Sequence, residues 1–124
     1  MRTILAVLLL ATIGCSGSPT EPAGIRTVTL RFGETASFSG TRITFTDVSD
    51  SRCAKDVVCA WAGDAAIRLE SGSDSVVLHS NATAGVTAAN LGGMHITLIM
   101  VRPERLTLDE PKKSEYLVTL RVSG

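Results

Sequence analysis

Apolar and polar residues alternate along most of the chain after residue 26. In residues 27–32 (TVTLRF), Val28, Leu30 and Phe32 fall on one side, with polar residues between them. Successive side chains of a β-strand point to opposite faces, so this period of two predicts strands with one buried face. No stretch keeps the three-and-four spacing of an amphipathic helix over three turns. We therefore expect an all-β domain.

Six further segments have strand character, and short runs rich in Gly, Ser, Asp or Pro separate several of them. They are 35–39, 42–48, 65–70, 75–79, 94–101 and 116–122. The spans 27–39 and 65–79 each suggest a hairpin, the second with a loop of four to five residues. About seven short strands in one domain predict an antiparallel sandwich or a small closed barrel.

Three of these segments carry more detailed predictions. The almost unbroken apolar run at 94–101 predicts a central strand covered on both faces and ended before Pro103. In 116–122, we expect Tyr116 and every second residue after it to point inward. A short helical turn is expected near residues 84–90.

Length and charge restrict the function classes. The 124 residues fit one domain, and 44% hydrophobic with 19% charged residues excludes intrinsic disorder. Twelve basic residues balance twelve acidic ones, so no excess positive charge favours binding to nucleic acid phosphates. We expect no nucleic acid partner and no cofactor.

The first fifteen residues have the layout of an export signal. Arg2 precedes the apolar run 4–11, and small residues end the run at Gly14-Cys15. A bilayer-spanning helix needs about 20 apolar residues, so the run is too short to span. The segment Thr12-Ile13-Gly14-Cys15 resembles the bacterial lipoprotein signal. The alternative is a plain secretory peptide cut a few residues later, near Gly17 or Ser18.

The lipoprotein resemblance implies an address and a division of the chain. Residues 1–14 would be removed, and Cys15 would carry a diacylglyceryl thioether and an N-acyl chain such as palmitate, which together anchor stably in a membrane. Ser16, where an Asp would signal retention in the inner membrane, implies the outer membrane of a two-membrane cell. Residues 15–25 are rich in Ser, Gly and Pro and predict a tether, leaving 26–124 as the β domain.

After export, Cys53 and Cys59 form an even pair in an oxidising compartment, which predicts a disulfide. The bridge would brace a loop over residues 50–63. We take this loop as a candidate binding loop, with these residues: Asp50, Arg52, Lys55, Asp56 and Trp61. A lone Trp in a small sandwich is more often packed than presented, so Trp61 is expected in the core; the alternative is an exposed aromatic anchor.

The braced loop also carries a second resemblance. It reads Asp50-Ser51-Arg52-Cys53, five residues, then Cys59-Ala60-Trp61-Ala62-Gly63. This resembles a signature of small bacterial lipoproteins of uncharacterised function, although Ala54 replaces their usual Pro. The resemblance implies no activity.

Signals for catalysis and metal binding are weak. The sequence has no Gly-x-Ser-x-Gly, no His-Glu-x-x-His and no phosphate-binding glycine loop. Met94, His95 and Met100 suit copper by ligand type, but a regular strand turns His95 away from both methionines. Four aspartates near the loop lack calcium-loop spacing: Asp47, Asp50, Asp56 and Asp64. We expect no metal site, and we expect surface or strand-edge positions for His79 and His95.

Three functions remain as hypotheses. The first is a tethered, non-enzymatic envelope protein that binds another envelope component or an exported molecule. The second is an inhibitor that inserts loop 50–63 rigidly into the cleft of an exported hydrolase. The third is an enzyme whose site carries no motif. A cluster of titratable groups in a cleft would favour the enzyme, and an exposed Trp61 would favour binding.

Overall fold

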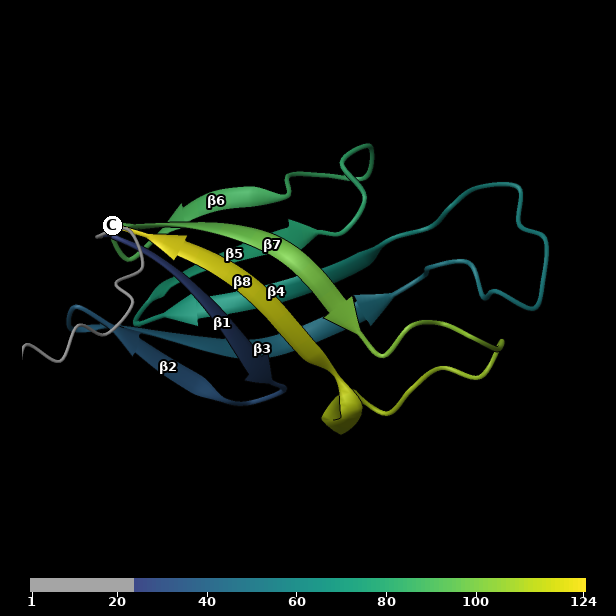
Figure 1. The fold of residues 1–124 in the computed structure, drawn as a ribbon, viewed down its shortest axis with the longest axis horizontal. Helices are drawn as coiled ribbons and strands as arrows, with labels where there is room; N and C mark the ends of the chain where they lie inside the picture. The colour runs from purple at the N-terminus through teal and green to yellow at the C-terminus, as the bar shows by residue number, and fades with distance from the viewer. Residues whose placement is uncertain (1–23) are drawn as a thin grey trace, which may run out of the picture.

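The computed structural model describes residues 24–124, which form two stacked, four-stranded antiparallel sheets (Figure 1). One sheet has the order β1 (Ile25–Arg31), β8 (Leu117–Ser123), β7 (Met94–Arg102), β6 (Ala88–Leu91). The other has the order β2 (Thr35–Phe38), β3 (Thr41–Asp50), β4 (Ala65–Ser71), β5 (Asp74–His79). The predicted antiparallel sandwich is confirmed, with eight strands instead of about seven.

The two sheets do not close into a barrel, so the sandwich is the correct one of the two predicted architectures. A short 3-10 helix, Lys113–Glu115, precedes β8. No helix within residues 24–124 is long and apolar enough to cross a membrane. The predicted signal peptide and the predicted acylation site, Cys15, lie outside the described residues.

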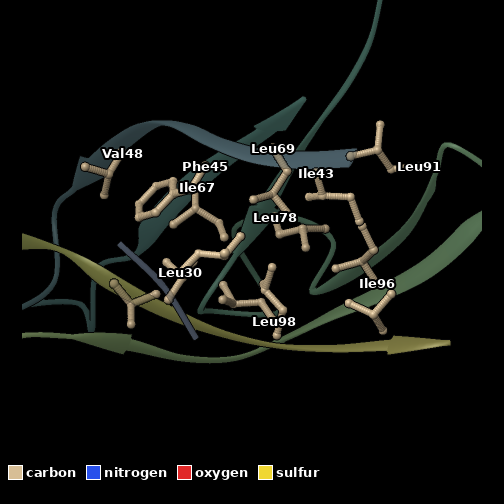
Figure 2. Close-up of a cluster of buried hydrophobic side chains, with 14 of the residues drawn as sticks. Leu30, Ile43, Phe45, Val48, Ile67, Leu69, Leu78, Leu91, Ile96 and Leu98 are labelled. Carbon is tan, nitrogen blue, oxygen red and sulfur yellow. The ribbon is translucent and has the colours of Figure 1, made fainter. Parts of the chain in front are cut away.

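The core lies between the inner faces of the two sheets (Figure 2). On β3, Ile43 and Phe45 are fully buried, and Ile67 and Leu69 of β4 lie beside them with no exposed surface. From the opposite sheet, Leu30, Ile96 and Leu98 complete the same cluster. The period of two in the sequence therefore corresponds to one buried face per strand.

Two sequence predictions hold, the second with a shorter turn than expected. Tyr116 and the alternating residues after it (Val118, Leu120, Val122) are each at most 1% exposed. The 65–79 hairpin is β4–β5, where Ser71 pairs with Asp74. Its loop has two residues, shorter than the expected four to five, because the strands continue pairing to the turn. Gly72 takes a positive φ of 58° there, as tight hairpin turns require.

The expected hairpin at 27–39 is wrong. β1 pairs with β8, and β2 pairs with β3, so the two segments belong to different sheets. The chain crosses between the sheets at the intervening turn, where Phe32 N donates to Tyr116 O and Gly33 N donates to Phe45 O. Alternation fixes which face of a strand is buried, but it does not specify the neighbouring strand.

The predictions for residues 84–101 also need correction. β7 is covered on one face only: Ile96 is buried, whereas Ile99 and Met100 are 44% and 42% exposed. The register shifts between Leu98 and Met100, and a β-bulge of this kind interrupts the alternation. The expected helical turn near 84–90 is absent; Ala88–Leu91 forms β6, because it pairs with β7.

The two ends of the sandwich differ in what they carry. Ile25, where β1 begins, pairs with Ser123 near the C-terminus, so the N-terminal segment joins the domain at this end (Figure 1). The connections 51–64 and 103–112 lie at the other end of the sandwich. β3 has ten residues, and at about 3.3 Å per residue it spans about 33 Å between the two ends.

Candidate functional site

The candidate site is the long connection 51–64 between β3 and β4, which projects from the sandwich (Figure 1). The β3–β4 pairing continues into its base: Ser51 N donates to Asp64 O at 2.7 Å, and Cys53 N donates to Ala62 O at 3.1 Å. Cys53 and Cys59 form a disulfide with their Cα atoms 5.9 Å apart. The predicted bridge is confirmed. The connection 51–64, called the braced loop from here on, is closed at its base by these hydrogen bonds and across its middle by the disulfide.

A buried carboxylate holds the loop to the sandwich. Asp50 ends β3, and its side chain has no exposed surface. Arg52 donates to this carboxylate from Nε and Nη2, both at 2.8 Å, and from its backbone nitrogen at 3.1 Å. The same guanidinium donates to the carbonyl oxygens of Val101 at 3.0 Å and Pro103 at 2.7 Å. Asp50 and Arg52 thus join the ends of β3 and β7, which belong to opposite sheets.

Tyr116 completes this polar cluster. Its hydroxyl donates to Asp50 Oδ2 at 2.7 Å from the start of the last strand. Burial disfavours ionisation of Asp50, but hydrogen bonds from Arg52 and Tyr116 outweigh it and hold the pKa of Asp50 below its usual value. Burial and the hydrogen bond to Asp50 raise the pKa of Tyr116 above that of a free phenol. The carboxylate therefore stays charged and paired inside the domain.

A second loop, residues 103–112, lies against the braced loop. Arg105 is its anchor: Nη1 donates to Asp50 O, and Nη2 donates to Leu108 O, both at 3.2 Å. Lys55 N donates to Arg105 O at 2.9 Å, and Lys55 Nζ pairs with Glu104 at the same distance. The two loops therefore form one connected surface at this end of the sandwich.

The structure divides the five predicted loop residues into two groups. Asp50 and Arg52 point inward and support the loop: the Asp50 side chain has no exposed surface, and that of Arg52 is 18% exposed. Lys55, Asp56 and Trp61 are exposed. The expected core position of Trp61 is wrong: the indole is 82% exposed, because the loop extends past the end of the sandwich and no element covers it. Val58, beside it in the loop, is fully exposed.

Sequence reasoning missed three residues of this site. Tyr116 and Arg105 contact Asp50 although each lies more than fifty positions away in the sequence. The only sequence signal was the predicted burial of Tyr116, because a buried Tyr hydroxyl usually has a hydrogen-bond partner. Gly63 has a positive φ of 69°, and a Cβ there would lie 1.9 Å from Ser51 O. Gly63 is thus required for the close approach of the two chains at the base of the loop.

The histidines have local partners. His79 Nδ1 lies 2.6 Å from Asp64 Oδ2, and Asn81 N donates to the other oxygen of this carboxylate at 3.0 Å. Burial opposes ionisation of Asp64, but the hydrogen bonds from His79 and Asn81 lower its pKa. The contacts of Asp64 with His79 and Asn81 attach the 80–87 connection to the base of the braced loop. His95 hydrogen-bonds Asn90, and no group of three potential metal ligands gathers within residues 24–124.

Comparison of the chain with protein-family models, with curated proteins and with solved structures gave no match.

Proposed function

We propose that this protein is a membrane-tethered, non-enzymatic lipoprotein of the bacterial cell envelope whose braced loop binds another envelope component. One observation carries the proposal: a loop fixed by a disulfide and a buried ion pair exposes Trp61, at the end of the sandwich opposite the one where β1 begins. A domain anchored through Cys15 would direct this loop away from its membrane.

The energetics of association support a binding role. A surface that is already ordered loses little conformational entropy on binding, so more of the contact energy contributes to affinity. Here the base of the loop is hydrogen-bonded and Asp50 connects it to both sheets. Trp is among the residues that most often dominate protein interfaces, and an exposed Trp on a rigid support offers such an anchor.

The anchor is tested by cell fractionation. We expect the wild-type protein in the membrane fraction, with an intact mass showing loss of residues 1–14 and addition of acyl chains at Cys15. The Cys15→Ser variant should appear in the soluble fraction. A mature wild-type protein that is soluble and carries an unmodified Cys15 contradicts the lipoprotein proposal.

The binding role is tested by crosslinking in the native cell. A photoreactive amino acid replaces Val58, which leaves Trp61 in place, and in a matched control it replaces Asp74, which is exposed in the β4–β5 turn at the opposite end. We expect position 58 to capture a defined envelope protein that position 74 does not capture. Equal capture at both positions, or none at position 58, rules out the loop as the binding surface.

Inhibition of an exported hydrolase is the second candidate. The braced, protruding loop exposes Trp61 and has the rigidity that insertion into an enzyme cleft requires. The crosslinking experiment distinguishes the two functions. A captured hydrolase that loses activity when the purified protein is added supports inhibition, whereas a captured protein without hydrolase activity supports a binding module.

A further inference from the structure

The second loop, which the sequence analysis did not assign to any site, contains an open cleft. The cleft has a volume of about 480 Å³, and the following residues line it: Pro103, Glu104, Leu106, Thr107, Asp109, Glu110, Pro111 and Glu115. Its lining combines three apolar side chains with four carboxylates and includes no basic residue. The cleft therefore offers apolar contact and negative charge together.

Three of these carboxylates lack a counter-charge. Glu104 pairs with Lys55, whereas Glu115 accepts a hydrogen bond from the backbone nitrogen of Lys112 at 2.8 Å. Asp109, Glu110 and Glu115 form no ion pair with any residue of the described part of the chain, 24–124. Like charges that line one concave surface add their fields and attract cations.

Exposed apolar residues lie in the second loop and in the braced loop, at the same end of the domain as the cleft. Leu106 and Leu108 of the second loop are 59% and 70% exposed. The neighbouring braced loop exposes Trp61 and Val58, and the two loops are hydrogen-bonded to each other through Lys55 and Arg105. Apolar side chains concentrated beside charged ones at one end of a domain are characteristic of a protein-binding surface.

We infer that the cleft binds a basic polypeptide segment of the partner, with a Lys or Arg beside Asp109 and Glu110 and an apolar side chain against Leu106. The inference rests on the proposed function, because it identifies the chemistry of the partner that the braced loop would contact. Charge complementarity selects this occupant: an acidic segment or an anionic lipid surface would be repelled by the unpaired carboxylates.

The test starts from a displayed library of random nonapeptides selected on the purified protein. We expect the selected peptides to carry Lys or Arg next to apolar residues and to bind more weakly as salt concentration rises. The double variant Asp109→Asn, Glu110→Gln should weaken the binding of a selected peptide by about 3- to 10-fold, since each exposed ion pair contributes little by itself.

A matched variant controls for net charge and for folding. The double variant Glu70→Gln, Asp74→Asn also removes two negative charges, but it removes them at the β4–β5 turn, at the opposite end of the sandwich. We expect it to leave peptide affinity unchanged, and we expect both double variants to keep the wild-type melting temperature within a few degrees. Peptides without basic residues, failure to select any peptide, or equal affinity of the two variants would overturn the inference.

Crosslinking separates this inference from the proposed function. If position 58 captures the same partner from cells with and without the Asp109→Asn, Glu110→Gln substitutions, and in equal amount, the loop binds a partner but the acidic cleft plays no part. If position 58 captures nothing while basic peptides still bind the purified protein through Asp109 and Glu110, the cleft binds basic segments and the proposed role of the loop fails.

Discussion

The hydroxyl of Tyr116 donates a 2.7 Å hydrogen bond to Asp50, whose carboxylate is also the acceptor for Arg52. Tyr116 immediately precedes β8 of one sheet, and Asp50 ends β3 of the other. One buried carboxylate thus connects the two sheets at the end of the sandwich from which the braced loop projects. The position of that loop depends on a polar contact between residues distant in sequence.

Removing the Tyr116 hydroxyl tests this connection. Tyr116→Phe keeps the buried ring but leaves Asp50 with one hydrogen bond fewer, and we expect a loss of about 1–3 kcal/mol in the free energy of unfolding. Equilibrium urea unfolding measures it. An unchanged unfolding free energy would show that this contact contributes nothing to stability.

The buried carboxylate also predicts how stability depends on pH. Hydrogen bonds from Arg52 and Tyr116 outweigh the effect of burial and lower the pKa of Asp50 in the folded state. The unfolded chain, with a pKa of about 3.9 for Asp, therefore binds more protons in acid, so this stabilisation is present at neutral pH and is lost as pH falls below about 4.

Asp50→Asn isolates this contribution. At pH 7 we expect the variant to lose about 2–4 kcal/mol, because Arg52 keeps its partly buried charge without a carboxylate partner. The difference in unfolding free energy between wild type and variant should shrink between pH 5 and about pH 3. A difference that stays constant over this range contradicts a lowered pKa for Asp50.

Gly63→Ala tests the close approach at the base of the loop. The new methyl group would meet Ser51 O, and the positive φ of 69° adds backbone strain, so we expect a loss of about 2–4 kcal/mol. Gly72→Ala is the control, since Gly72 also has a positive φ but has open space around it. If both variants lose the same stability, the contact with Ser51 has no effect and only backbone strain acts.

The disulfide predicts a moderate change in stability. Replacing both Cys53 and Cys59 with Ser removes a constraint on a short loop, so we expect a loss of about 2–3 kcal/mol with little change in the far-UV circular dichroism of the strands. Thermal unfolding measures the loss. Two free thiols in the denatured exported wild-type protein would contradict a bridge between these residues.

Trp61→Ala separates binding from folding. The indole is 82% exposed, so its removal should change the unfolding free energy by no more than about 0.5 kcal/mol. A crosslinker placed at Val58 should nevertheless capture less of the partner from cells that carry this variant. Strong destabilisation would show instead that the indole packs against the domain.

The sequence alone determined seven of the eight strands and the inner face of most of them. Alternation in 27–32 and 116–122 identified residues that the structure buries, because burial on one face of a strand leaves a period of two in the sequence. The pairing of Cys53 with Cys59 could also be predicted from the sequence, because residues 24–124 contain two cysteines, which allow one intramolecular bridge.

Only the tertiary structure decided strand order and the positions of the loop side chains. Alternation is the same whichever strand lies alongside, so β1 could not be assigned to β8 from its residues. Trp61 has a residue type suited to the core, but the loop carries it past the end of both sheets. Asp50 and Arg52 appear in sequence as a polar loop, whereas Tyr116 makes them a buried cluster, because side chains sixty-six positions apart meet only when the two sheets stack.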